Sequence, residues 1–225
     1  MRHILPLGTA LLLLPAAASA ASFPCSKATT LDEKAVCADR TLSGLDDRMG
    51  TVYREAIRLM SGSDPDENIT QKAVKRDQKA WLAERRACGG DTACLRTSYE
   101  RRLAEISFSP APASTSPAER FVGRFGFGGF MSLDALALRD GTVAVSVSGT
   151  EPKTARWVCG FTGIGHVAAD GALRIEAADA NIRGLIITPA AKGGLTIPDG
   201  QPNEDTSFSS CGNGGTIMLV YTRKR

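Results

Sequence analysis

Histidine and closely spaced cysteine pairs, which build most metal and redox centres, are scarce in this sequence. The chain has two histidines, His3 and His166, and no C-x-x-C motif. A thioredoxin-like redox centre is therefore excluded, and a zinc site lacks the close Cys and His ligands that it needs. No G-x-S-x-G elbow lies near His166, so this lone histidine is more typical of a surface position than of a Ser-His-Asp triad. We expect no catalytic residue, no metal and no cofactor.

A marked excess of either charge is also missing. The chain carries 27 Lys and Arg residues against 24 Asp and Glu residues, for a formal net charge of +3 at pH 7. The parts before and after residue 107 are each nearly balanced, so neither has the basic face that is typical of nucleic-acid binding. Balance also weakens long-range electrostatic steering onto a charged enzyme. We expect a protein partner to be held by local fit, and no nucleic acid to be bound.

Long apolar runs are limited to the start of the chain. Residues 1 to 20, "MRHILPLGTALLLLPAAASA", combine a basic residue, an apolar run and a small-residue end at Ala18-Ser19-Ala20. This pattern predicts a secretory signal peptide cleaved after Ala20, because the run is shorter than the ~20 residues that span a bilayer. The first cysteine, Cys25, lies too far past that site to be a lipid-modified N-terminal residue. We expect a periplasmic or secreted protein without stable membrane insertion.

The cysteines and one linker-like stretch divide the rest of the chain. Six cysteines stand at positions 25, 37, 88, 94, 159 and 211, and an even number in an exported protein favours disulfides. Four of them precede "SFSPAPASTSPA", residues 107 to 118, and two follow it. This Ser-, Pro- and Ala-rich stretch predicts a linker. We therefore expect a helical domain at residues 21–106 and a β domain at residues 119–225, each small enough to need covalent support.

Residues 30 to 106 have the periodicity of helices. "TLDE" at Thr30 to Glu33 is a capping-box pattern that predicts a short helix to about Ala38. Apolar residues at three- and four-residue steps predict a second helix after it, a third from about Ile69 to Ala87, and a fourth that Asp91 caps. Gly89-Gly90 should end the third helix. The result is a small helical domain pinned by disulfides.

The pairing of the first four cysteines stays open, because four cysteines permit three connectivities. A nested arrangement would join Cys25 to Cys94 and Cys37 to Cys88, and so tie the N-terminal arm to both sides of the Gly-Gly turn. This is the arrangement that we expect. Whichever pairing holds, we interpret these four cysteines as structural.

Two stretches of the helical half resemble a known family. They are "PCSKATTLDEKAVCADRTLSGLDDRM" and "RDQKAWLAERRACGGDTACLRTSYERRLAEI", within residues 23 to 106. The four-cysteine spacing, the C-A-D after the short helix and the W-x-x-x-R-x-x-C at Trp81, Arg85 and Cys88 resemble the N-terminal domain family named for the lysozyme inhibitor LprI. The resemblance implies export, a compact helical fold and, for the namesake, inhibition of lysozyme. It does not imply an enzyme.

Both motif residues are interpreted as structural. Trp81 shares an apolar stripe with Val74 and Cys88, which predicts a core position rather than a ligand platform. Arg85 lies one turn further along, where it could pair with a carboxylate, cap carbonyls or face a partner. Pairing with a carboxylate is the interpretation that we favour.

The half that follows the linker reads as β structure. "LDALALRDGTVAVSVSG" places two alternating apolar runs around Asp140-Gly141, which is a strong hairpin signal. Turn signals at similar spacing downstream predict six to eight antiparallel strands in a small barrel or sandwich. We expect Cys159 and Cys211 to pair. In "FVGRFGFGGF", residues 121 to 130, phenylalanines alternate with glycines, and we interpret them as barrel core rather than as an aromatic binding surface.

Three functions remain open at this point. The first is an inhibitor that binds non-covalently to a lysozyme-type glycosidase. The second is a cell-envelope binding or scaffolding protein that uses the β domain to hold a protein or glycan. The third, a hydrolase built on His166, has the least support. An inhibition assay with lysozyme separates the first from the other two.

Overall fold

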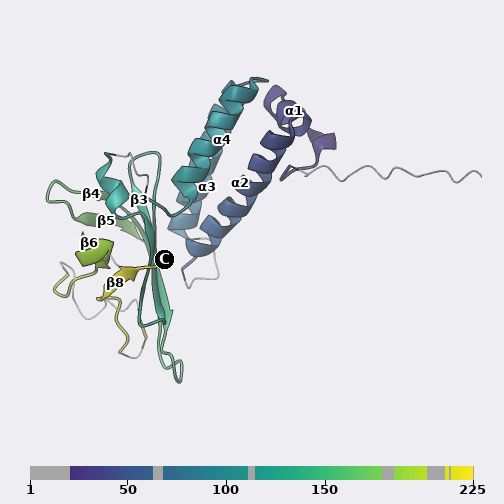
Figure 1. Cartoon of the computed structure of the whole chain (residues 1–225). Helices are drawn as coiled ribbons and strands as arrows, with labels where there is room; N and C mark the ends of the chain where they lie inside the picture. The colour runs from purple at the N-terminus through teal and green to yellow at the C-terminus, as the bar shows by residue number, and fades with distance from the viewer. Residues whose placement is uncertain are drawn as a thin grey trace, which may run out of the picture.

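The computed structural model describes residues 21–62, 68–110, 115–178, 185–201, 211–212 and 214–224. The expected signal peptide at residues 1–20 lies outside these ranges, as does the middle of the expected linker. Helices make up the N-terminal part of the described chain and strands the C-terminal part, as Figure 1 shows. The expected α+β class is therefore confirmed. None of the helices in these ranges has the length and apolar character needed to cross a membrane.

The N-terminal part is an arm of four helices. They are α1 (Leu31–Ala38), α2 (Arg40–Leu59), α3 (Ile69–Ala87) and α4 (Thr92–Ile106). Side-chain caps start them as expected, since Glu33 accepts from the Thr30 amide at 3.0 Å and Asp91 accepts from the Ala93 and Cys94 amides. The bounds of α3 are those predicted from the sequence.

The arm projects away from the strands, as Figure 1 shows. Its distal end, defined here as residues 22–41 and 85–96, holds α1, the start of α2, the end of α3 and the start of α4. Its base holds the end of α2, the start of α3 and the end of α4. The distal end and the base are therefore opposite ends of one arm.

The C-terminal part is a closed antiparallel barrel, which decides between the barrel and the sandwich. Each strand pairs with the next, and β1 pairs with β8 to close the sheet. The strands are β1 (Gly123–Phe127), β2 (Met131–Ala137), β3 (Val143–Thr150), β4 (Val158–Val167), β5 (Leu173–Ala178), β6 (Ile186–Pro189), β7 (Leu195–Thr196) and β8 (Val220–Arg223). The 3-10 helix η2 (Pro117–Arg120) overlaps the end of the expected linker, and its Ala118 packs into the barrel core.

The arm and the barrel share one apolar core at their junction. Leu136, Ala144 and Ile164 are cross-strand partners on β2, β3 and β4, so they form a row across the sheet. This row packs against the apolar side chains of the helices rather than against the barrel interior. Burial of the row therefore depends on the arm staying in place.

The disulfides correct the nested pairing. The structure joins Cys25 to Cys37 and Cys88 to Cys94, so both bonds in the arm are local. The short 3-10 helix η1 (Cys25–Lys27) turns the chain back beside α1, and the Gly89-Gly90 turn brings the end of α3 next to the start of α4. The pair expected in the barrel, Cys159 with Cys211, is present.

The phenylalanine-rich segment has two roles. Phe121 and Phe125 are fully buried in the barrel core, as expected. Phe127 is 39% exposed, and its ring meets Phe130 edge-on, while Phe130 in turn meets Trp157. The interpretation of the whole segment as core is therefore wrong for Phe127. The chain turns between these rings at Gly128 and Gly129, both of which have positive φ.

Candidate functional site

Trp81 and Arg85, the two motif residues that precede Cys88, are buried in the second half of α3. Trp81 is 1% exposed; its ring meets Tyr99 edge-on at 5.3 Å, and its Nε1 donates to Ser98 Oγ at 3.1 Å. Arg85 lies one turn further along α3 and is 6% exposed. Both residues therefore serve the packing of the arm and are not available as a surface platform.

Arg85 joins three other helices through buried charge-assisted hydrogen bonds. Its Nε and Nη2 donate to Asp32 Oδ2 on α1 at 3.1 and 2.9 Å. Its Nη1 donates to Tyr99 Oη on α4 at 2.8 Å and lies 3.5 Å from Asp46 Oδ1 on α2. One side chain of α3 thus fixes the positions of α1, α2 and α4.

Asp46 completes this buried network. Its Oδ1 accepts from Tyr99 Oη at 2.7 Å, and its Oδ2 accepts from the amide and hydroxyl of Ser22 at 2.7 and 2.6 Å. Because the carboxylate is satisfied on both oxygens, the chain before α1 is held against α2.

The network sets the protonation of its members. Burial by itself raises the pKa of Asp32, but the hydrogen bond from Thr30 and the charge of Arg85 outweigh burial and lower the pKa below its ordinary value. Burial raises the pKa of Tyr99 well above its ordinary value, so the phenol stays protonated and donates to Asp46. Asp32 is therefore charged and Tyr99 neutral at neutral pH.

The sequence predicts a carboxylate partner for Arg85 but does not identify the residue that supplies it. Asp32 and Asp46 are the partners, and both are at most 4% exposed. A signal for Asp46 is present in the sequence. It stands four residues after Leu42 and three before Met49, on the face of α2 that is buried.

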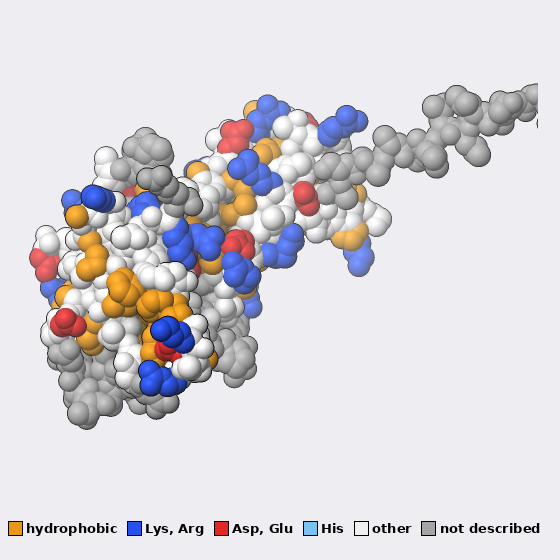
Figure 2. Space-filling view, turned by 60° about the horizontal axis from the view of Figure 1, so that its bottom comes forward, with side chains coloured by type: hydrophobic (Ala, Val, Ile, Leu, Met, Phe, Trp, Pro, Cys, Tyr) orange, Lys and Arg blue, Asp and Glu red, His pale blue; other side chains and the backbone are white. Residues whose placement is uncertain are grey.

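The surface of the distal end differs from its interior because cations dominate it. Five exposed cations lie there, and none of them forms an ion pair with another residue of the described ranges: Lys27, Lys34, Arg40, Arg86 and Arg96. Three acidic side chains share this surface, and each accepts hydrogen bonds from helix-start amides: Glu33, Asp39 and Asp91. On the face drawn in Figure 2, Lys and Arg predominate over Asp and Glu along the arm.

One apolar side chain stands out on the same surface. Leu31, the first residue of α1, is 68% exposed, more than any other large hydrophobic residue in the described ranges. Its neighbour Asp32 is buried on Arg85, so the fold of α1 holds Leu31 outward. The distal end therefore combines an apolar projection with cations, on a scaffold held by local disulfides and buried ion pairs.

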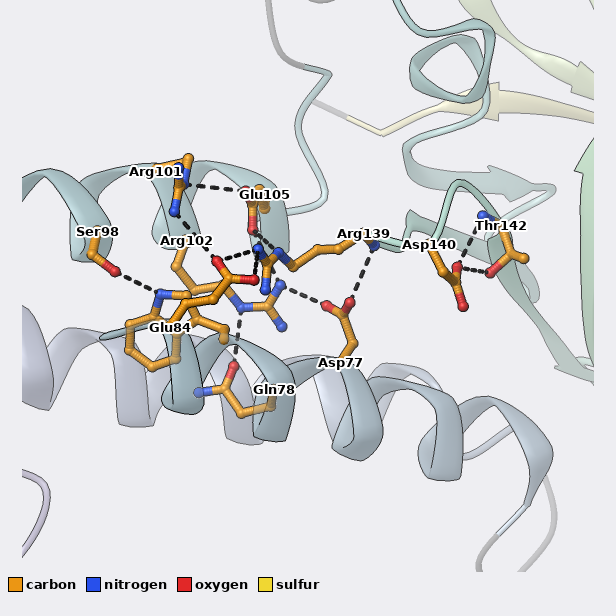
Figure 3. Close-up of polar contacts among 11 residues, drawn as sticks. Asp77, Gln78, Glu84, Ser98, Arg101, Arg102, Glu105, Arg139, Asp140 and Thr142 are labelled. Atoms are coloured by element: carbon orange, nitrogen blue, oxygen red, sulfur yellow. Dashed lines mark hydrogen bonds and ion pairs between the residues drawn. The ribbon is translucent and has the colours of Figure 1, made fainter. Parts of the chain in front are cut away.

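A second buried network holds the base of the arm to the barrel, as Figure 3 shows. Arg102 on α4 is 2% exposed; its Nη1 donates to Asp77 Oδ2 at 2.6 Å, and its Nε donates to Gln78 Oε1 at 3.0 Å. Asp77 Oδ1 also accepts from the backbone amide of Arg139, in the loop after β2, at 3.1 Å. Asp77 therefore connects α4 of the arm to the barrel.

The remaining histidine lies away from both networks. His166 Nδ1 is 3.0 Å from Glu176 Oε2, and both side chains are more than half exposed. This places His166 on the barrel surface. Within the described ranges, no three His, Cys, Asp or Glu side chains gather as metal ligands.

Comparison with known proteins agrees with the resemblance of the helical half. The family model described as "Lysozyme inhibitor LprI" matches residues 25–116, which include the arm and none of the barrel strands. "Lipoprotein LprI" of Mycobacterium bovis and of Mycobacterium tuberculosis are each 30% identical over 99 residues, covering 43% of this chain and 46% of the relative. The chain thus spans less than half the length of these relatives. No solved structure matches. The arm is therefore similar to the LprI family over residues 25–116, and no family model matches the barrel.

Proposed function

We propose that this exported protein inhibits a lysozyme-type glycosidase by non-covalent binding, and that the helical arm is the part that binds. The observation that carries the proposal is the family match, because it coincides with the arm and stops before the first strand. The description of that family as a lysozyme inhibitor supports the activity, and the three disulfides support export. The proposal needs no catalytic residue and no cofactor.

The construction of the arm suits an inhibitor. A protein that occupies an enzyme cleft binds more tightly when its contact surface is already ordered, because less conformational entropy is lost on binding. The distal end is ordered by the bonds Cys25–Cys37 and Cys88–Cys94 and by the buried ion pair between Arg85 and Asp32. The second network bonds the base of the arm to the loop after β2 of the barrel.

The direct test is an inhibition assay with the full-length mature protein. A fixed amount of a lysozyme is titrated with the protein, and the rate of cell-wall hydrolysis is measured. We expect the rate to fall as the protein reaches micromolar concentration, while a glycosidase of a different fold, assayed in parallel, keeps its rate. Unchanged lysozyme activity at a large excess of the protein would remove the proposal.

A second candidate is the envelope binding or scaffolding protein, and the barrel supports it. The rings of Phe127, Phe130 and Trp157 form an edge-to-face series at one end of the barrel, outside the region that the family model covers. Aromatic side chains that are partly exposed are common at binding surfaces. Recovery of one envelope component by the protein, together with full lysozyme activity in its presence, would favour this candidate.

A further inference from the structure

We infer that the distal end of the arm is the contact surface, and that it holds the glycosidase by placing Leu31 and the surrounding cations against the carboxylates of the catalytic cleft. This inference rests on the proposed function and adds the surface and the chemistry of the contact. It commits to one partner, a glycosidase whose cleft carries paired carboxylates.

The exposure of Leu31 is the first support. A large apolar side chain that is 68% exposed costs solvation free energy in the free protein, and its burial in a complex recovers that free energy. Interfaces commonly have an apolar centre that is surrounded by a polar rim. Leu31 is the first residue of α1, and Figure 1 shows α1 at the end of the arm that lies away from the strands.

The distribution of ion pairs is the second support. Toward the base of the arm, Arg58 pairs with Glu55 and Arg76 pairs with Asp140. At the distal end, Arg86 and Arg96 have no such partner within the described ranges.

The nearby acids do not compensate these cations. Glu33, Asp39 and Asp91 direct their oxygens onto the amides at the starts of α1, α2 and α4. The helix starts carry partial positive charge, which holds these carboxylates at the caps rather than on the cations. The cations of the distal end are therefore left to meet anionic groups of a partner.

The buried network places these groups together. Leu31 precedes Asp32 and Arg86 follows Arg85, and the ion pair between Asp32 and Arg85 measures 2.9 Å. The apolar projection and one of the cations thus flank the same buried ion pair. Arg96 is two residues beyond Cys94, whose bond to Cys88 connects it to the end of α3. The buried ion pair and this disulfide thus connect the parts of α1, α3 and α4 that carry the exposed groups.

Glycosidases of the lysozyme type supply the complementary chemistry. Two carboxyl groups flank the scissile bond in these enzymes, about 5–5.5 Å apart in a retaining enzyme such as lysozyme. A cation brought beside them in a cleft from which water is excluded interacts far more strongly than it would in bulk water. Near-neutrality of the whole inhibitor does not oppose this contact, because the contact depends on local charges at short range.

The test compares charge reversals at two places on the full-length protein. Arg86→Glu with Arg96→Glu changes the distal end, and Lys153→Glu with Arg120→Glu makes the same change in charge at exposed positions of the barrel part. Inhibition of lysozyme is measured for both, and circular dichroism with a free-thiol assay checks folding. We expect the inhibition constant to rise at least tenfold for the distal pair and less than twofold for the barrel pair. Leu31→Ser does not change the charge of the protein, and it should also raise the inhibition constant several-fold.

A double-mutant cycle identifies the carboxylate. The distal pair is assayed for binding to a lysozyme whose catalytic glutamic acid is replaced by glutamine. We expect the reversal to cost less affinity against this enzyme than against the unchanged one. If the unchanged protein inhibits and the distal variants inhibit equally well, or if the barrel pair loses as much, the inference is overturned while the proposed function stands. If the unchanged protein does not inhibit at all, the proposed function itself fails.

Discussion

At the scale of single residues, Arg85 is the side chain on which the shape of the arm depends. It reaches Asp32, Asp46 and Tyr99, which belong to three different helices. A buried guanidinium with two carboxylates gives the helices a specific arrangement, because any shift leaves a charge unpaired. The motif that sequence reasoning singled out is therefore explained by structure rather than by contact with a partner.

Arg85→Ala should destabilise the protein by about 3–5 kcal/mol, because it leaves Asp32 and Asp46 buried without a cation. The adjacent exposed residue gives a matched control: Arg86→Ala should change the free energy of unfolding by at most about 0.5 kcal/mol. Urea unfolding followed by circular dichroism measures both. Equal small effects would show that the buried network contributes little.

The acid stability of the arm should depend on Glu33. Hydrogen bonds from the amides of Thr30 and Thr29 lower its pKa from 4.5 to about 2. A lowered pKa stabilises the folded state fully above pH 4.5, and this stabilisation is lost as the pH falls towards 2. Glu33→Gln keeps the cap geometry but cannot titrate. We expect the free energy of unfolding to fall less steeply between pH 4.5 and 2 in this variant than in the unchanged protein. Identical slopes would contradict the assignment.

The sequence predicts apolar positions of the arm better than buried polar ones. Trp81 follows from its stripe, because seven-residue steps keep a side chain on one face of a helix. Asp46 and Asp77 lie on buried faces as well. Judged by residue type alone, however, an aspartate is expected at the surface. Their burial depends on Arg85 and Arg102, which come from other helices. The periodicity of one helix does not show which side chains of another helix will contact it.

At the scale of elements, helix starts are well specified by local chemistry. Thr30 to Glu33, Asn68 and Asp91 cap α1, α3 and α4, and the first and last of these caps were expected from the sequence. The disulfide pairing of the arm was not expected from the sequence, because the position of Cys25 depends on the turn η1 before α1. That turn has no periodicity from which it could be predicted.

The three disulfides should differ in how much they stabilise the protein. The bond Cys88–Cys94 spans 6 residues and Cys159–Cys211 spans 52. Because a longer loop loses more entropy when it is closed, replacing both cysteines by alanine should cost about 2 kcal/mol for the first bond and about 4 kcal/mol for the second. Thermal unfolding of the two double variants tests the order. A larger cost for Cys88–Cys94 would show that local helix geometry outweighs loop entropy.

At the scale of the whole molecule, the arm and the barrel are coupled through their junction. The row of Leu136, Ala144 and Ile164 packs on the helices, and Asp77 bonds both Arg102 and the Arg139 amide. The division into domains at residues 21–106 and 119–225 stays a prediction. A barrel or sandwich followed from the strand spacing, whereas closure by β1 and β8 is a long-range pairing that spacing does not specify.

Coupling predicts one calorimetric unfolding transition for the unchanged protein. Asp77→Ala removes the acceptor that Arg102 shares with the Arg139 amide, and leaves Arg102 buried with Gln78 and Glu105 as partners. We expect this variant to unfold in two separate transitions at a lower temperature. Arg76→Ala breaks only the exposed pair with Asp140 and should leave one transition nearly unmoved. Two transitions in the unchanged protein would show that the junction contributes little to stability.

Hydrogen–deuterium exchange, measured on the full-length protein with and without a lysozyme, tests the central claim most directly. This measurement shows whether the distal end of the arm contacts the enzyme. We predict slower exchange on binding at residues 22–41 and 85–96, with the strands of the barrel unchanged. Protection confined to the barrel, with the distal end exchanging as in the free protein, would contradict the account.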